Sequence, residues 1–146
     1  MVEALFGVRG RMGRLSYLGF GALIFFIGFA ALVILGILES GRGQGEEALM
    51  RTMESASLLF ALLLLWPCAA LTAKRLHDLG SSGWHAAWIA ALGVVSLFVP
   101  ATDTLLGLAV AAVLLGVAAW LLLAPGQAQA NAHGPPPGAE ATEEQG

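Results

Sequence analysis

Charged residues are scarce in this chain of 146 residues: Asp, Glu, Lys and Arg make up 12% of it, against 58% hydrophobic residues. With a mean hydropathy of +0.79, the sequence has too few polar side chains to cover the surface of a water-soluble domain. A single cysteine, Cys68, excludes an internal disulfide. The composition therefore indicates that the main solvent of this protein is a lipid bilayer.

Four hydrophobic runs are long enough, or nearly long enough, to cross a bilayer, whose hydrocarbon core takes about 20 helical residues. They cover residues 18–38, 56–73, 84–99 and 105–124. The third run is the shortest and contains His85, so it is the weakest candidate. We predict an all-α, polytopic membrane protein in which residues 1–125 form a domain of four transmembrane helices.

The four runs contain no Asp, Glu, Lys or Arg. Ion and proton pathways usually place ionisable groups within the bilayer, so a coupled transporter acting alone is disfavoured. The three histidines, His77, His85 and His133, lack the spacing typical of metal ligands. We therefore expect no metal and no cofactor.

The composition changes abruptly after Ala124. Residues 126–146 are dominated by Pro, Gly, Ala, Gln and Glu, with three consecutive prolines from Pro135. A segment of this kind buries too little apolar surface to offset the entropy lost on ordering. We expect a disordered C-terminal tail.

Basic residues flank the four runs unevenly, and cytoplasmic loops of membrane proteins are enriched in Lys and Arg. Five of the seven lie before the first run or between the second and third: Arg9, Arg11, Arg14, Lys74 and Arg75. The loop of residues 39–55 holds the other two, and the loop around Asp103 has none. In a four-span arrangement, the aromatic residues that prefer the headgroup level also face one side: Tyr17, Trp84, Trp88 and Trp120. Both termini are therefore expected in the cytoplasm.

A compact polar block, residues 74–84, separates the second and third runs. Asp78 is three residues from Arg75 and four from Lys74, so it can pair with either base if the helix continues into the block. Gly80 is suited to end that helix, and Ser82 to cap the next one. The whole block can thus be a structural turn, with Trp84 anchoring the return into the membrane.

An enzyme is the alternative interpretation of the same block. His77 titrates near neutral pH and stands beside Asp78, so the two could act as an acid–base pair in a membrane enzyme or a transport accessory. No clear nucleophile or phosphate-binding loop accompanies them in the sequence. A non-enzymatic membrane protein is the favoured hypothesis.

The basic residues suggest what such a protein binds. Each Lys or Arg near an anionic leaflet contributes about 1 kcal/mol of attraction, so anionic lipid headgroups are the expected ligands, with a cytoplasmic or membrane protein as the alternative. Nucleic acid is not expected, because there is no basic domain with exposed aromatic residues. Small residues on the later runs would also allow a homo-oligomer. The candidate lipid- or partner-binding residues are Arg9, Arg11, Arg14, Lys74, Arg75, His77, Asp78 and Trp84.

Three pieces of the sequence resemble the domain of unknown function 805 family, a group of uncharacterised bacterial inner-membrane proteins. The pieces are residues 6–14 (FGVRGRMGR) with Tyr17, Arg75-Leu76-His77-Asp78 with Ser82-Gly83-Trp84, and Asn131 with Gly134-Pro135. Family members often carry an aromatic residue where this chain has His133. The resemblance implies a small multi-span protein of the inner membrane and brings no established activity.

Overall fold

The computed structural model describes residues 5–43, 45–99 and 104–139. Within these residues the chain forms four long helices: α2 (Arg14–Ser40), α3 (Glu46–Asp78), α4 (His85–Phe98) and α5 (Leu105–Leu123). The predicted all-α class is confirmed. The expected loop around Asp103 and residues 140–146 of the expected tail lie outside the described residues.

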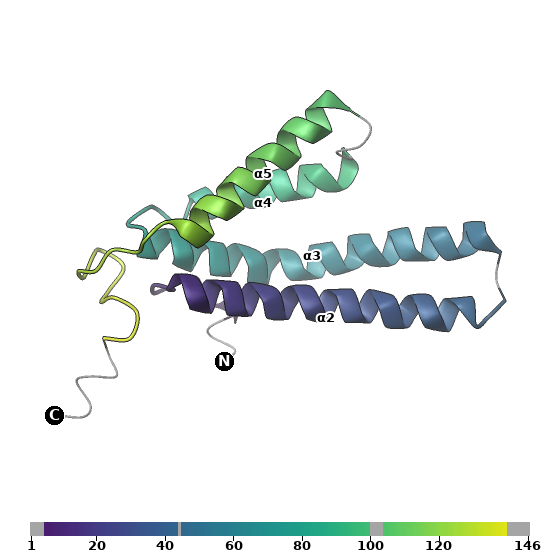
Figure 1. Cartoon of the computed structure of the whole chain (residues 1–146), viewed down its shortest axis with the longest axis horizontal. Coiled ribbons are helices and arrows are strands. Elements are labelled where there is room, and N and C mark those ends of the chain that lie inside the picture. The colour runs from purple at the N-terminus through teal and green to yellow at the C-terminus, as the bar shows by residue number, and fades with distance from the viewer. Residues whose placement is uncertain (1–4, 44, 100–103, 140–146) are drawn as a thin grey trace.

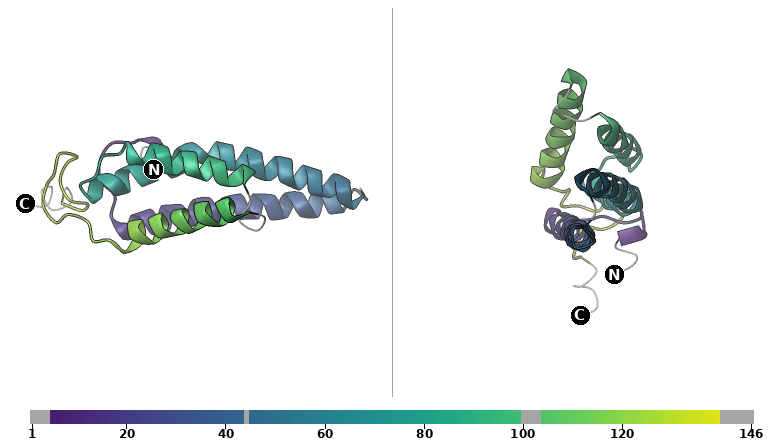
Figure 2. Two further views of the ribbon diagram at one scale, coloured as in Figure 1. Left: turned by 90° about the horizontal axis from the view of Figure 1, so that it is seen from above. Right: turned by 90° about the vertical axis from the view of Figure 1, so that its right-hand side faces the viewer.

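The helices form two antiparallel hairpins (Figure 1). At 1.5 Å per residue, the 27 residues of α2 and the 33 of α3 extend about 40 and 50 Å, well beyond the second hairpin of α4 and α5. Viewed along the long axis, α4 and α5 lie to one side of the α2–α3 pair (Figure 2). The start of α2, the end of α3, the start of α4 and the end of α5 share one end of the molecule. We call it the basic end, because it carries Arg9, Arg11, Arg14, Lys74 and Arg75.

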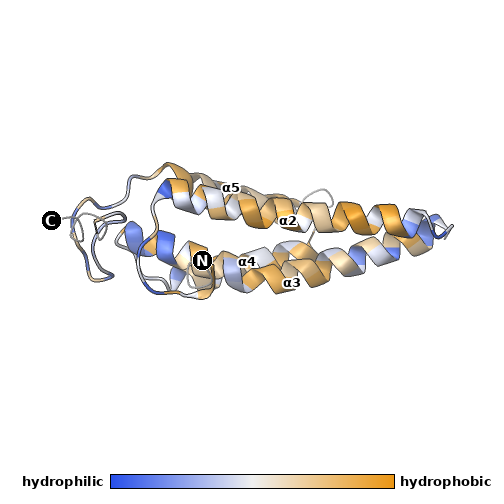
Figure 3. Cartoon of the chain, turned by 90° about the horizontal axis from the view of Figure 1, so that it is seen from below, coloured by the Kyte–Doolittle hydropathy of each residue, from blue (hydrophilic) through white to orange (hydrophobic). Residues whose placement is uncertain are grey.

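Three of the helices, α2, α3 and α5, are long and apolar enough to cross a membrane. Apolar residues cover the length of the helices, and hydrophilic ones gather at the two ends (Figure 3). Large apolar side chains such as Phe25 and Leu115 are mostly exposed, which suits contact with lipid and not with water. Helix α4 is apolar too, but its 14 residues extend only about 21 Å, less than the roughly 30 Å hydrocarbon core.

Burial is concentrated at the basic end. One cluster of buried residues consists of Ala73, Leu76, Ala86 and Leu121, and a second of Met12, Ile24 and Leu71. Both clusters include residues of the last two turns of α3, where nearly every side chain from Ala70 to Asp78 is buried. The end of α3 is therefore the core of the molecule, although it carries three charged residues, Lys74, Arg75 and Asp78.

The segment before α2 lies along α3. The backbone N–H of Met12 donates to the carbonyl of Lys74 (3.2 Å), and the indole of Trp66 donates to the carbonyl of Phe6 (3.2 Å). Because Trp66 and Lys74 are about 12 Å apart along the helix axis, the segment descends from the basic end alongside the apolar part of α3. The segment before α2 therefore packs against α3. The spacing of its arginines does not predict this contact.

The chain after α5 crosses beneath the end of α3 (Figure 1). As expected from its composition, it forms no helix up to residue 139. It is nevertheless held in place, because the N–H of Gln127 donates to the carbonyl of Asp78 (2.9 Å), and Asn131 and Gly134 exchange backbone hydrogen bonds. We call residues 125–139 the tail segment.

Candidate functional site

The end of α3 is formed by a left-handed glycine. Gly80 has φ +75°, the N–H of Gly80 donates to the carbonyl of His77 (3.0 Å), and the N–H of Ser81 donates to the carbonyl of Leu76 (2.8 Å). These two bonds are those of a Schellman motif, which satisfies carbonyls left open at a helix end. The helix stop expected at Gly80 is thus present, and α3 does continue past Ala73 to Asp78.

The turn into α4 brings His77 against a second glycine. A Cβ atom on Gly83 would lie 2.5 Å from Nε2 of His77, so only glycine fits there without moving the imidazole. The hydroxyl of Ser82 accepts from the N–H of Trp84 (3.3 Å). The N-cap residue of α4 is Trp84, and no side chain caps it, so the expected cap at Ser82 is wrong. Trp84 itself is 76% exposed.

Arg75 ties the end of α3 to the end of α5. Its side chain is fully buried and donates to Oδ2 of Asp78 (2.5 Å) and to the carbonyls of Leu121 (2.7 Å) and Ala124 (2.5 Å). Carbonyls at a helix C-terminus have no partner within the helix, so the guanidinium also caps α5. The predicted pairing of Arg75 with Asp78 is confirmed.

Asp78 is shared with a second arginine from the segment before α2. Nε and Nη2 of Arg11 lie 3.2 and 3.0 Å from Oδ1 of Asp78, and the two side chains are only 1% and 4% exposed. Arg11 also donates to three carbonyls of the tail segment, those of Gln127, Gln129 and Gly134. Burying a charge is costly unless it is paired and hydrogen-bonded. Arg11, Arg75 and Asp78 are all both paired and hydrogen-bonded.

The tail segment supplies the remaining contacts around His77. The side chain of Asn131 donates to the carbonyl of His77 (2.9 Å), and the ring of His133 stacks on the ring of His77 with centroids 3.8 Å apart. On its other side, Nδ1 of His77 is 3.1 Å from the carbonyl of Gly10. We call the assembly of Arg11, Arg75, His77, Asp78 and Asn131 the polar clasp, because it joins all three pieces of the family resemblance.

The eight predicted site residues divide into two groups. Lys74, Arg75 and Asp78 are buried and Arg11 and His77 are partly buried, whereas Arg9, Arg14 and Trp84 are exposed. Both carboxylate oxygens of Asp78 accept from arginines, so a role for Asp78 as a general base beside His77 is disfavoured by its contacts. The sequence did not predict that Gln127 binds Asp78 and Arg11, or that the ring of His133 stacks on that of His77. The family pieces at Asn131 and Gly134 were the only signal that the tail segment belongs to the site.

Two hollows adjoin the polar clasp. The first, of about 580 Å³, lies among basic and backbone groups, including Arg9, Gly10, Lys74 and the prolines from Pro135. The second, of about 470 Å³, is lined mainly by small and aromatic apolar residues of α3 and α4. His133 lines both. Within the described residues, no group of three His, Cys, Asp or Glu side chains is placed to hold a metal ion.

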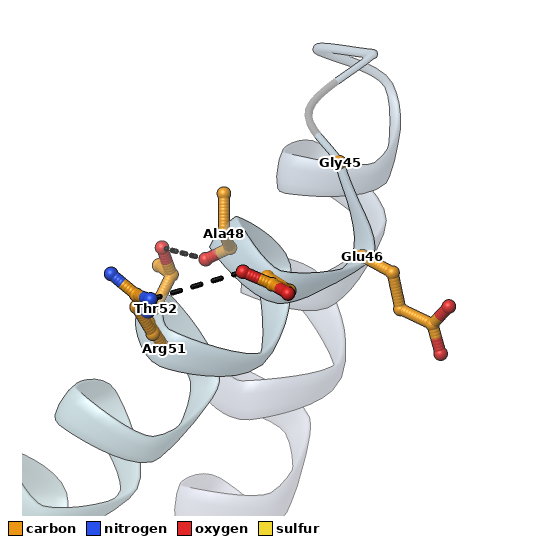
Figure 4. Close-up of a pocket in the computed structure, with 6 residues that line it drawn as sticks. Gly45, Glu46, Ala48, Arg51 and Thr52 are labelled. Carbon is orange, nitrogen blue, oxygen red and sulfur yellow. Dashed lines mark hydrogen bonds and ion pairs between the residues drawn. The ribbon is translucent and has the colours of Figure 1, made fainter.

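A third hollow, of about 590 Å³, lies at the opposite end of the molecule (Figure 4). All its lining residues come from the first turns of α3, between Gly45 and Thr52. Thr52 donates to the carbonyl of Ala48 (3.0 Å), Arg51 pairs with Glu47 at 3.8 Å, and Glu46 points away from them. The hollow is the exposed surface of one helix end, with no second element to enclose a ligand, so we place the candidate site at the basic end.

A family model described as "Protein of unknown function (DUF805)" matches residues 5–135. The match includes the segment before α2, all four helices and most of the tail segment, and therefore every residue of the polar clasp. No curated protein and no solved structure matches the chain.

Proposed function

The chain belongs to the DUF805 family, whose description assigns no activity, and from that premise we propose a function based on the geometry of the basic end. The protein is a multi-span component of the bacterial inner membrane, with its basic end in the cytoplasmic leaflet. There it binds the anionic headgroups of lipids through Arg9 and Arg14. The polar clasp holds the segment that carries these two arginines.

The distribution of charge carries this proposal. Among the described residues, five Lys and Arg residues gather at the basic end around one carboxylate, that of Asp78. The other described carboxylates, Glu39, Glu46, Glu47 and Glu54, lie at the far ends of α2 and α3. Asp78 neutralises one of its two arginine partners, so the described residues of the basic end keep an excess of positive charge. Such an excess beside an apolar bundle suits an anionic membrane surface.

The contacts of the tail segment support a cytoplasmic position for both ends of the chain. The hydrogen bonds of the tail segment to the end of α3 and to Arg11 support a position on the same side of the membrane as the start of α2. This holds whether the short α4 crosses the whole bilayer or turns back within it. The excess of Lys and Arg at that end favours the cytoplasmic side.

The test is lipid selectivity in detergent. The purified protein is mixed with equal amounts of phosphatidylglycerol and phosphatidylcholine of identical chains, and the bound lipids are counted by native mass spectrometry. We expect phosphatidylglycerol to be enriched. Arg9→Gln removes an exposed charge without touching the polar clasp, and it should weaken the binding of phosphatidylglycerol about fivefold, since one basic residue contributes about 1 kcal/mol.

Arg51→Gln is the matched control, because Arg51 is also an exposed arginine and lies at the opposite end. It should leave the lipid ratio unchanged. Equal binding of the two lipids by the unmodified protein, or an equal loss in Arg9→Gln and Arg51→Gln, would contradict the proposal.

A further inference from the structure

The apolar hollow beside the polar clasp lies between three elements. The segment before α2 forms one side, the last turns of α3 form the floor, and the start of α4 forms the other side. Its apolar lining includes Val8, Trp66, Ala69, Ala73, Trp84 and Ala87. The hollow has a volume of about 470 Å³, and the two indoles that line it are largely exposed. It is therefore a groove built by parts of the chain far apart in sequence.

Polar side chains occur at one end of this groove only. His77 and Ser82 line it where α3 ends, whereas Trp66 lies in the hydrophobic run of residues 56–73. From Trp66 to His77 the groove follows α3 for about 16 Å. A groove that is polar at the membrane surface and apolar below it matches a molecule with one polar end and one hydrocarbon chain.

We infer that this groove holds one hydrocarbon chain of the anionic lipid whose headgroup lies at the basic end, an inference that rests on the function proposed above. Charge complementarity identifies the polar end as anionic. The groove adjoins the basic hollow, the two share His133, and the basic hollow is lined by the exposed Arg9. A lipid seated in the groove places its headgroup beside Arg9.

The groove suits a lipid chain better than a helix of a second protein. Trp66 and Trp84 are 58% and 76% exposed, so the groove lining reaches the surface of the molecule and a chain can enter from the bilayer. The segment before α2 contacts Trp66 through the carbonyl of Phe6, and the groove lining extends along α3 from Trp66 to His77, little more than three helical turns. A packed helix needs a longer open face, whereas a hydrocarbon chain needs only a narrow one.

The experiment fills the groove and leaves the charges in place. Ala87→Phe places a ring in the groove, and Ala91→Phe, one turn further along α4 and outside the groove lining, is the matched control. The probe is lyso-phosphatidylglycerol, which has one chain, titrated into the protein in detergent and followed by native mass spectrometry. Ala87→Phe should weaken its binding about tenfold, since excluding two methylene groups from an apolar site costs about that factor. Ala91→Phe should bind as the unmodified protein does.

A second pair of variants serves if Ala87→Phe does not fold. Trp84→Ala removes one edge of the groove, and its control, Trp88→Ala, removes an indole one turn along that does not line it. Weaker binding in Trp84→Ala alone supports the inference. If Arg9→Gln weakens binding but neither groove variant does, headgroup binding at Arg9 is supported. The inference that the groove holds a hydrocarbon chain is then wrong. If the groove variants weaken binding and Arg9→Gln does not, the proposed anionic headgroup is wrong, and with it the inference of an anionic occupant.

Discussion

The effects of substituting Arg75 and Asp78 on the free energy of unfolding should be strongly coupled. The two side chains are 0% and 4% exposed, and Nη1 of Arg75 lies 2.5 Å from Oδ2 of Asp78. Removing one member of a buried pair leaves an uncompensated charge, which costs about 3–5 kcal/mol of folding free energy. Arg75→Met should fall in the upper part of that range, because it also leaves the carbonyls of Leu121 and Ala124 without their donor.

The double variant Arg75→Met/Asp78→Leu should cost less than the two single variants together. It removes both charges, and Arg11 keeps the carbonyls of the tail segment as acceptors. Coupling between contacting residues is about 0.5–3 kcal/mol, and we expect the upper half of that range. The free energy of unfolding is measured by reversible SDS titration in mixed micelles.

A second pair on the same helix gives the control. Arg51 and Glu47 are also an ion pair, at 3.8 Å, but their side chains are 79% and 93% exposed. Solvent screens such a pair. The double-mutant cycle of Arg51→Met and Glu47→Leu should therefore show several-fold weaker coupling than that of Arg75→Met and Asp78→Leu. Simple additivity at Arg75 and Asp78, or equal coupling at the two ends of α3, would refute the reasoning.

Two further variants test the turn and the tail segment. Gly80→Ala should lower the free energy of unfolding by about 1–2 kcal/mol, because alanine is strained at φ +75° and its Cβ would meet Gln127. Gly93→Ala, in the middle of α4 with open space around it, should be neutral or stabilising in the same titration, and a loss as large as that of Gly80→Ala would argue against the helix stop. Asn131→Ala should increase hydrogen exchange in residues 125–139, because it removes the donor to the carbonyl of His77, and unchanged exchange would mean that Asn131 does not hold the tail segment.

Much of the fold follows from local patterns in the sequence. The apolar runs indicate the helices because lipid-exposed helices must be apolar over their whole length. The spacing of Arg75 and Asp78 predicts their contact because both lie on one helix face, and Gly80 predicts the helix end because it tolerates a left-handed conformation. These features depend on residues within one helix or its end.

The rest of the site depends on contacts between distant parts of the chain. Arg11 and Asp78 are 67 residues apart, and no periodicity links them. Arg11 also binds backbone carbonyls of the tail segment, and every residue has a carbonyl, so these contacts leave no pattern in the sequence. For the described residues 126–139, the composition correctly indicates a segment without helix or strand. It does not indicate that arginine and asparagine side chains hold part of that segment in place.

The position of the basic end relative to the membrane is the central claim, and site-specific labelling tests it most directly. Gly45→Cys and Ala130→Cys, each in a Cys68→Ala background, place one thiol at the far end of the α2–α3 hairpin and one in the tail segment. We predict that a membrane-impermeant maleimide added to intact spheroplasts labels position 45 alone. Position 130 should become reactive only in inverted membrane vesicles. Labelling of both positions from the same side would contradict the account.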